Sequence, residues 1–190
     1  MTMRVLFGAL AFLLLVAPAN ADEAGLKALK AGGHVMMIRH GLTTPGSGDP
    51  LGFKLEDCAT QRNLIEEGRT ESRKLGELLR ALGIEVERVL SSEWCRCIET
   101  AELISVGKVE REPALNNLYG RPQNRAKQVD AMRALIAGWK GAGNLLLSTH
   151  GANMGALMGI NPETAAGVVL KPMPETKEGF AVVGRISPEG

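Results

Sequence analysis

Two of the three histidines in this sequence lie in similar tripeptides. The tripeptides are Arg39-His40-Gly41 and Thr149-His150-Gly151. A neutral imidazole can act as a nucleophile or a general base, and a glycine beside it lets backbone and ligand approach closely. These two histidines are therefore the first candidates for catalysis.

Arginines accompany the histidines along the sequence. Arg39 precedes His40 directly, and Arg96 lies in Ser91–Ala101, at another expected strand-to-helix junction. If Arg62 joins them, three guanidinium groups converge on the histidines, and a guanidinium binds phosphate oxygens in a bidentate fork. The cations would also disfavour imidazolium and balance the charge of a phosphoryl group in transfer. The pattern therefore predicts phosphoryl chemistry on a neutral histidine.

Other chemistries fit this pattern less well. Two histidines could hold a metal, but carboxylates near them are few and the arginines repel a cation, so no metal is expected. A thiolate at Cys95 or Cys97 beside Arg96 is a second alternative, although an oxidising compartment favours a disulfide. The sequence has no G-x-S-x-G elbow, Walker loop or G-x-G-x-x-G loop. Both histidines could also be structural residues.

The elements that must position these residues alternate between strands and helices. Short apolar runs predict strands over Val35–Ile38, Val86–Leu90, Asn144–Ser148, Gly167–Leu170 and Phe180–Ile186. Helical spacing and caps predict helices over Glu66–Leu82, from Ser91 or Ser92 to about Ile104, from about Asn124 to Trp139, and over Ala152–Met158. The fold class is therefore α/β, with a mainly parallel central sheet covered by helices on both faces.

The predicted sheet gathers the candidate residues at one edge. His40 and His150 each follow a predicted strand directly, and reacting groups collect at the carboxyl ends of parallel strands. His34 precedes a strand at the opposite edge, so it is expected to be structural. The loop Leu42–Ala59, rich in Gly, Pro and Asp, is expected at the mouth of the pocket.

The first 21 residues differ from the rest of the chain. Arg4 is followed by the uncharged run Val5–Val16 and then by the small-residue triplet Ala19–Ala21. This pattern is typical of a secretory signal peptide, whereas a membrane span needs about 20 apolar residues. We expect cleavage after the triplet, a domain over residues 22–190 without stable membrane insertion, and a periplasmic or secreted location. An uncleaved anchor or a buried N-terminal helix is the alternative.

Composition narrows the classes of partner. Lys and Arg number 22 against 21 Asp and Glu, and aromatic residues make up 4% of the chain. A nucleic-acid-binding surface needs a clustered basic excess and stacking aromatics, so no nucleic-acid partner is expected. Apolar residues at 45% and charged residues at 23% are typical of a globular domain.

Four motifs resemble those of the histidine phosphatase superfamily in its first branch, the phosphoglycerate-mutase-like proteins. They are R-H-G at Arg39–Gly41, Gln61-Arg62-Asn63-Leu64 with Gly68, S-x-x-x-x-R-C-x-x-T-A over Ser91–Ala101, and Thr149-His150-Gly151. They occur in the family's order across roughly Gly33–Pro172. The resemblance implies a phosphoglycerate-mutase-like, three-layer α/β/α sandwich that works without a metal or cofactor.

The resemblance also implies roles for individual residues. His40 would attack phosphorus and become a phosphohistidine that water hydrolyses, while Arg39, Arg96 and His150 hold the phosphoryl oxygens. Arg62 would be a further substrate contact. The expected substrate is a phosphorylated small molecule, a lipid-linked sugar or a phosphoprotein. A phosphoglycerate-mutase-type phosphotransferase is an alternative, although an exported protein would rarely meet glycolytic intermediates.

The sequence departs from the family pattern at the general acid. Many relatives have a glutamate where this sequence has Asn117, and an amide cannot donate a proton as a carboxylic acid does. Glu110, Glu112 or Asp49 would have to replace it, or the substrate would need a good leaving group, as phosphoramidates and phosphoanhydrides have. A catalytically weak or inactive protein that binds phosphate is the remaining alternative. The general acid therefore stays unassigned.

The three cysteines are expected to form one disulfide. Cys95 and Cys97 do not face each other on a helix, so Cys58 would pair with one of them. In cytosolic relatives a cysteine directly after the signature arginine is a small core residue, which makes Cys97 a buried thiol and favours a Cys58–Cys95 bond. A Cys58–Cys97 bond and three reduced thiols are the alternatives.

Overall fold

The computed structural model describes residues 22–189, which contain a six-stranded sheet. Its strands are β1 (Val35–Arg39), β2 (Val86–Ser91), β3 (Val109–Arg111), β4 (Asn144–Thr149), β5 (Gly167–Pro172) and β6 (Phe180–Ile186). They lie in the order β3-β2-β4-β1-β5-β6. β3, β2, β4 and β1 pair in parallel, whereas β5 and β6 are added in antiparallel orientation. The mainly parallel sheet predicted from the sequence is therefore confirmed.

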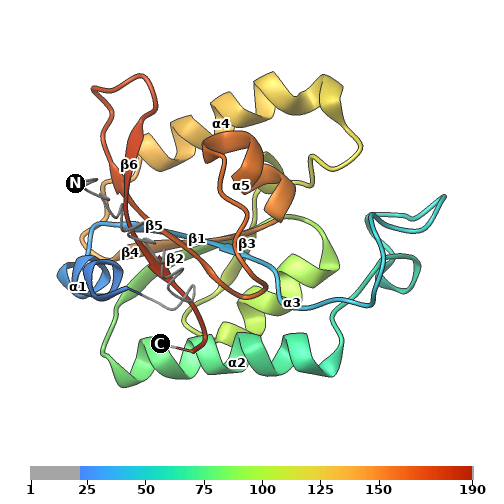
Figure 1. The fold of residues 1–190 in the computed structure, drawn as a ribbon, viewed down its shortest axis with the longest axis horizontal. Coiled ribbons are helices and arrows are strands. Elements are labelled where there is room, and N and C mark those ends of the chain that lie inside the picture. Colours follow the sequence, from blue (N-terminus) through green and yellow to red (C-terminus); the bar gives the residue numbers. More distant parts are fainter. Residues whose placement is uncertain (1–21, 190) are drawn as a thin grey trace, which may run out of the picture.

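Helices cover both faces of this sheet. They are α1 (Glu23–Ala31), α2 (Glu66–Ala81), α3 (Cys95–Ile104), α4 (Arg125–Ala137) and α5 (Gly151–Met158), and short 3-10 helices span Cys58–Thr60, Pro113–Leu115 and Pro122–Asn124. α1, α2 and α3 pack on one face, and α4 and α5 pack on the other (Figure 1). The molecule is thus a three-layer α/β/α sandwich.

The central strand β1 shows why helices are needed on both faces. Val35 and Met37 belong to the apolar cluster formed with α4 and α5, while Met36 and Ile38 belong to the cluster formed with α1 and α2. All four side chains are fully buried. Because alternate side chains of a strand point to opposite faces, a strand that is apolar at every position requires cover on both sides.

Some elements differ from the sequence-based prediction. Neither α1 nor β3 is predicted, because α1 adjoins the expected cleavage site and β3 has only three residues. The expectation that Ser91 or Ser92 caps α3 is wrong. Ser91 ends β2, and the N-cap residue is Trp94, which makes no side-chain capping bond. The chain therefore takes an extra turn between strand and helix, and the serine hydroxyls are left for other contacts.

The predicted signal peptide, residues 1–21, lies outside the described residues. Within residues 22–189, none of the helices has the length and apolar character needed to cross a membrane.

Gly41 allows the loop after β1 to lie against the first turns of α2. A Cβ atom at this position would lie 2.4 Å from the carbonyl oxygen of Gly68 and 2.9 Å from Oγ of Ser72. The Gly41 N–H also donates to Oγ1 of Thr100 in α3, at 2.9 Å. The glycine after His40 is therefore required by close contacts within the protein.

We expect Gly41→Ala to lower the free energy of unfolding by about 1–3 kcal/mol, the usual cost of extra carbon atoms in a close-packed site. Urea denaturation followed by circular dichroism measures this change. Gly155→Ala in α5 is the matched control, because a Cβ atom there would meet no heavy atom within 4 Å and alanine favours the helix. Equal unfolding free energies for the two variants would contradict this role of Gly41.

Candidate active site

His40 lies directly after β1, with its side chain only 4% exposed. Its backbone N–H donates to the carbonyl oxygen of Thr149 at the end of β4, which ties the two histidine segments together. Its Nδ1 lies 2.8 Å from the carbonyl oxygen of Gly41. A carbonyl oxygen only accepts hydrogen bonds, so Nδ1 carries the proton and Nε2 is the unprotonated nitrogen of the neutral ring. His40 therefore has the tautomer of an Nε2 nucleophile.

His150 lies beside His40, between β4 and α5. The two ring centroids are 5.4 Å apart in an edge-to-face arrangement, and the Trp94 ring makes a similar contact with His150 at 5.6 Å. Nε2 of His150 lies 2.9 Å from Oγ of Ser92, at the end of the β2 segment. The ring of His150 is thus held by residues that follow β1 and β2, the two strands that flank β4, and by Trp94 at the start of α3.

Three arginines line the same cavity, and each is anchored through Nη1. Nη1 of Arg39 donates to the carbonyl oxygen of Pro162 (3.0 Å), Nη1 of Arg62 to that of Gly46, and Nη1 of Arg96 to that of Arg62 (3.2 Å). The Nε–H group of each arginine is buried without a hydrogen-bond partner in the protein. Buried N–H groups normally have partners, so three unpaired donors around one cavity suit an anion with several oxygens.

The cavity itself has a volume of about 470 Å³ and is open to solvent. Besides both histidines and the three arginines, its polar lining includes Thr43, Ser47, Asn117, Tyr119, Asn161 and Thr164. Among the residues that the structure describes, no Asp or Glu side chain lines it. The predicted residues His40, Arg39, Arg96, His150 and Arg62 are therefore brought together in one cationic pocket.

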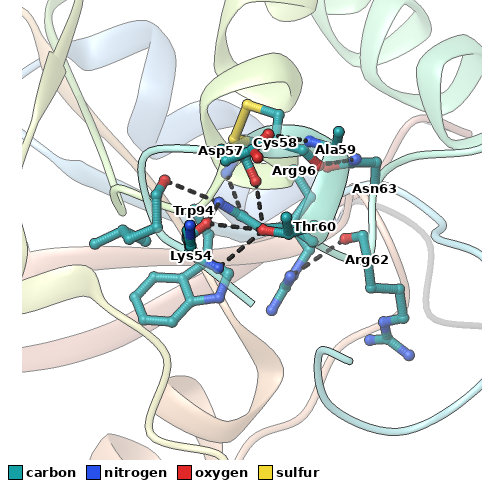
Figure 2. Close-up of a disulfide and its surroundings, with 12 residues drawn as sticks. Lys54, Asp57, Cys58, Ala59, Thr60, Arg62, Asn63, Trp94 and Arg96 are labelled. Carbon is teal, nitrogen blue, oxygen red and sulfur yellow. Dashed lines mark hydrogen bonds between the residues drawn. A yellow bond between two sulfur atoms is a disulfide. The ribbon is translucent and has the colours of Figure 1, made fainter. Parts of the chain in front are cut away.

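The disulfide joins the loop after β1 to the first turn of α3. Cys58 and Cys95 are bonded, with their Cα atoms 5.7 Å apart. Figure 2 shows the bond near Arg96 and Trp94 at the start of α3, with Arg62 on the same β1–α2 connection as Cys58. Cys97 is a free, buried thiol, as the resemblance implies, so the structure has the Cys58–Cys95 pairing rather than the Cys58–Cys97 alternative. Burial raises the pKa of Cys97 to about 12, so a thiolate at this position is disfavoured.

Comparison with known proteins identifies the family. The chain matches the model of the Histidine phosphatase superfamily (branch 1) over residues 35–142, more than half of its length. This chain belongs to the histidine phosphatase superfamily. The match includes the positions of Arg39, His40, Arg62 and Arg96.

A curated relative in the superfamily is the mitochondrial serine/threonine-protein phosphatase Pgam5 of Drosophila ananassae. The two sequences are 32% identical over 103 residues, which are 54% of this chain and 32% of the relative. The chain thus matches about a third of the length of that protein.

Solved structures share the phosphoglycerate-mutase-like fold. The protein histidine phosphatase SixA complexed with tungstate is 21% identical, with a TM-score of 0.56 over 82% of this chain and 97% of that chain. A putative alpha-ribazole-5'-P phosphatase from Escherichia coli is 17% identical, with a TM-score of 0.59 over the same shares. At these identities the likeness shows a common fold.

The three carboxylates considered as replacements for the general acid are all engaged elsewhere. Glu110 pairs with Arg88 on the surface, and Oε1 of Glu112 accepts the N–H of Ala114 in the Pro113–Leu115 turn. Asp49 forms an ion pair with Arg96. Burial alone would raise the pKa of Asp49, but the hydrogen bond and charge of Arg96 outweigh it, so the pKa lies below its usual value. Asp49 is therefore an ionised partner of Arg96 rather than a proton donor.

Asn117, the position at which the family resemblance predicts a glutamate, lies in the wall of the cavity. Its Oδ1 accepts the N–H of Tyr119 at 3.0 Å, which leaves the Nδ2 amide as its group for the cavity. An amide N–H donates a hydrogen bond but no proton. The structure therefore agrees with the sequence-based expectation that Asn117 cannot act as a general acid.

No group of three or more His, Cys, Asp or Glu side chains that could hold a metal ion is found within the described part of the chain.

Sequence reasoning missed several neighbours of the catalytic candidates. Ser92, the carbonyl group of Gly46 and the indole of Trp94 all contact the histidines or arginines. Ser92 and Trp94 lie inside the signature segment, and their placement could have been suspected from it. The Gly46 carbonyl lies in an irregular loop, where no periodicity indicates which backbone group turns inward.

Both catalytic candidates are held as neutral imidazoles. Burial, followed by the charge of Arg96, lowers the pKa of His40 to about 3. Burial and the same arginine lower the pKa of His150 well below its usual value, and the neighbouring His40 adds to this effect. A neutral His40 keeps its Nε2 lone pair across the ordinary pH range.

These pKa values predict that acid destabilises the protein. The unfolded chain binds a proton at each histidine below about pH 6.5, whereas native His40 stays neutral until about pH 3. Each such histidine therefore contributes stability above pH 6.5 that falls by about 1.4 kcal/mol per pH unit as the pH decreases toward the native pKa. His40→Gln should reduce the slope of unfolding free energy against pH by about this amount between roughly pH 4 and 6, measured by urea titrations. Identical slopes for variant and wild type would contradict a neutral buried His40.

The disulfide is expected to stabilise the protein by closing a long loop. The bonded cysteines are 37 residues apart, for which loop-closure entropy gives about 4 kcal/mol. We expect Cys58→Ala/Cys95→Ala to lower the free energy of unfolding by roughly that amount. The wild type reduced with dithiothreitol should have the same free energy of unfolding as the double variant. Reduction should also increase the mass of the wild type by that of two hydrogens. An unchanged mass after reduction of the denatured protein would show that the bond is not formed.

Proposed function

We propose that this protein is a phosphatase that hydrolyses a phosphoryl compound through a phosphohistidine on His40. The observation that carries the proposal is that one cavity is lined both by His40, whose Nε2 is unprotonated, and by three arginines whose buried Nε–H groups have no hydrogen-bond partner. A nucleophile and a set of anion-binding donors are what phosphoryl transfer requires. Membership of the histidine phosphatase superfamily supports the same chemistry.

The reaction then has two displacement steps at phosphorus. In the first, the Nε2 lone pair of His40 forms a bond to phosphorus while the bond from phosphorus to the leaving group breaks. In the second, water attacks the phosphorus, the P–N bond breaks, and inorganic phosphate leaves with His40 regenerated. Arg39, Arg62 and Arg96 balance the charge on the phosphoryl oxygens in both steps, and His150, which lines the same cavity, helps to hold these oxygens.

The cavity favours substrates whose leaving group needs no strong acid. No described carboxylate lines it, and Asn117 cannot donate a proton. Phosphoanhydrides and aryl phosphates have weakly basic leaving groups. A phosphoramidate whose nitrogen has already taken a proton from solvent leaves as a neutral amine or imidazole, so all three classes would react without an acid from the protein. The name of the structural neighbour SixA, a protein histidine phosphatase, supports a phosphoramidate of a phosphoprotein as one such substrate.

We also propose that the protein acts outside the cytoplasm, in the periplasm or as a secreted protein. The predicted signal peptide supports this location. The Cys58–Cys95 bond supports it independently, since disulfides persist in oxidising compartments.

We expect His40→Ala to hydrolyse para-nitrophenyl phosphate at least about 10³-fold more slowly than the wild type, because the nucleophile is removed. A phosphoryl group retained on the wild-type protein after alkaline quench, and located by mass spectrometry, should be absent from the variant. The wild type should also hydrolyse phosphoramidate far faster than an alkyl phosphate.

His34→Ala is the matched control for this experiment. His34 makes the same kind of contact, from Nδ1 to the carbonyl oxygen of Gly32 at 2.7 Å, but it lies at the opposite end of β1. It should keep wild-type activity. Equal hydrolysis by wild type and His40→Ala would refute the proposal.

The second candidate is a phosphate-binding protein without turnover, and the cavity without a carboxylate favours it. It predicts binding of inorganic phosphate or vanadate but no hydrolysis of phosphoramidate or para-nitrophenyl phosphate. Transfer of the phosphoryl group to an added hydroxy acid instead of water would identify a phosphotransferase.

A further inference from the structure

One carboxylate is buried against the cationic cavity. The Asp49 side chain, in the loop after β1, is 2% exposed. Its Oδ1 accepts from Nη1 of Arg96 at 2.6 Å, and its Oδ2 accepts from Nη2 at 3.2 Å. It also accepts the backbone N–H of Arg62 (3.1 Å) and the indole N–H of Trp94 (2.9 Å). Both oxygens of the carboxylate are therefore fully used within the protein.

The hydrogen bonds of Arg96 determine which edge of its guanidinium is free. Nη1 donates to Asp49 and to the carbonyl oxygen of Arg62, so both its N–H groups are used. Nη2 gives one N–H to Asp49, and Nε–H has no partner. In the planar guanidinium the Nε–H and the remaining Nη2–H point to the same side. Asp49 thus occupies the end of the fork, and the side edge remains for an anion.

We propose that Asp49 is a positioning residue that fixes Arg96 with this side edge toward the phosphoryl group. The inference rests on the proposed function, because it assigns the phosphoryl group to this cavity. An arginine held at its end by a carboxylate cannot rotate about its long side chain, so its two remaining donors meet phosphate oxygens without further loss of entropy. The same carboxylate holds the backbone of Arg62, so it orders two of the three arginines.

The loop that carries Asp49 is built to keep this contact in place. The Cys58–Cys95 bond fixes the end of the loop to the residue before Arg96. Oε1 of Gln61 accepts the backbone N–H of Cys95 at 3.0 Å, and its Nε2 donates to the carbonyl oxygens of Lys54 and Leu55. The loop and the start of α3 are therefore linked by one covalent bond and by hydrogen bonds through Gln61.

A positioning role and a simple charge effect predict opposite results. Removing a negative charge beside a cationic pocket should by itself strengthen anion binding. If Asp49 instead orients Arg96, its removal should weaken anion binding although the pocket becomes more positive. The sign of the change in affinity therefore separates the two roles.

The test is titration calorimetry of inorganic phosphate with the full-length wild type and Asp49→Asn. We expect the variant to bind phosphate at least about tenfold more weakly, with a matching increase in KM for para-nitrophenyl phosphate. Asp57→Asn is the matched control, because Asp57 lies in the same loop, is exposed and caps the Cys58–Thr60 turn without contacting an arginine. It should bind phosphate like the wild type. Unchanged or tighter binding by Asp49→Asn would overturn the proposal.

A double-mutant cycle shows whether Asp49 acts through Arg96. In an Arg96→Gln background, Asp49→Asn should cause no further loss of phosphate affinity. An equal loss in both backgrounds would overturn the proposal.

If Asp49→Asn does not fold, nitrogen-15 NMR of the wild type replaces it. Hindered rotation should then give separate Nη1 and Nη2 signals for Arg96, and phosphate should shift its Nε–H. Averaged Nη signals would overturn the proposal. Phosphate binding without turnover would refute the proposed function and leave this test valid, whereas a wild type that binds no phosphate overturns both.

Discussion

Mutual repulsion among the cations Arg39, Arg62 and Arg96 is the constraint on which the rest of the site depends. They line one cavity, in which Arg96 is buried and Arg39 and Arg62 are partly buried, so the fold must supply the interactions that hold them there. The backbone does most of this, because each Nη1 donates to a carbonyl oxygen from a loop. Asp49 supplies the only carboxylate that pairs with any of these arginines in the described chain.

Burial first, and this concentration of positive charge second, lower the pKa values of the two histidines. Imidazolium would add further cations to a buried pocket, so both rings stay neutral. The Gly41 carbonyl then fixes which nitrogen of His40 carries the proton. In the proposed function the arginines thus have two effects, since the positive charge that would attract phosphate also helps burial to keep His40 unprotonated. The loss of stability in acid is the thermodynamic counterpart of that arrangement.

The residues that could be predicted from the sequence are those fixed by regular structure. His40 and His150 follow apolar strands whose order in a parallel sheet brings their ends together, and Arg96 begins the helix after a third such strand. Asp49 could be named as a carboxylate near the pocket, but its role could not be assigned. It lies in an irregular loop, where the direction of a side chain depends on long-range contacts and not on periodicity.

The expected cap of α3 shows that sequence-based prediction can also fail where the residue types suit the predicted role. Ser91 and Ser92 have the composition of a cap, yet tertiary structure uses them differently. Ser91 completes the parallel pairing of β2, and Ser92 contacts His150 instead of an amide of the helix. The capping preference of serine is overridden here by tertiary contacts, because the end of β2 also lies at the edge of the candidate active site. A serine can cap a helix or contact a residue of the site, so it is a weak predictor of a helix cap where the element ends at a functional cavity.

The lining of the cavity finally connects electrostatics with choice of substrate. A protonated carboxylic acid among three guanidinium groups would lose its proton, since each cation lowers a carboxyl pKa. Asp49 is an example, because the hydrogen bond and charge of Arg96 outweigh burial and hold its pKa below the usual value. A general acid in this pocket would need to lie apart from the arginines, and Asn117, where the family resemblance predicts a glutamate, cannot serve as one. In the proposed reaction the charges that assist attack on phosphorus therefore act against proton donation, which is why we propose substrates whose leaving group needs no acid from the protein.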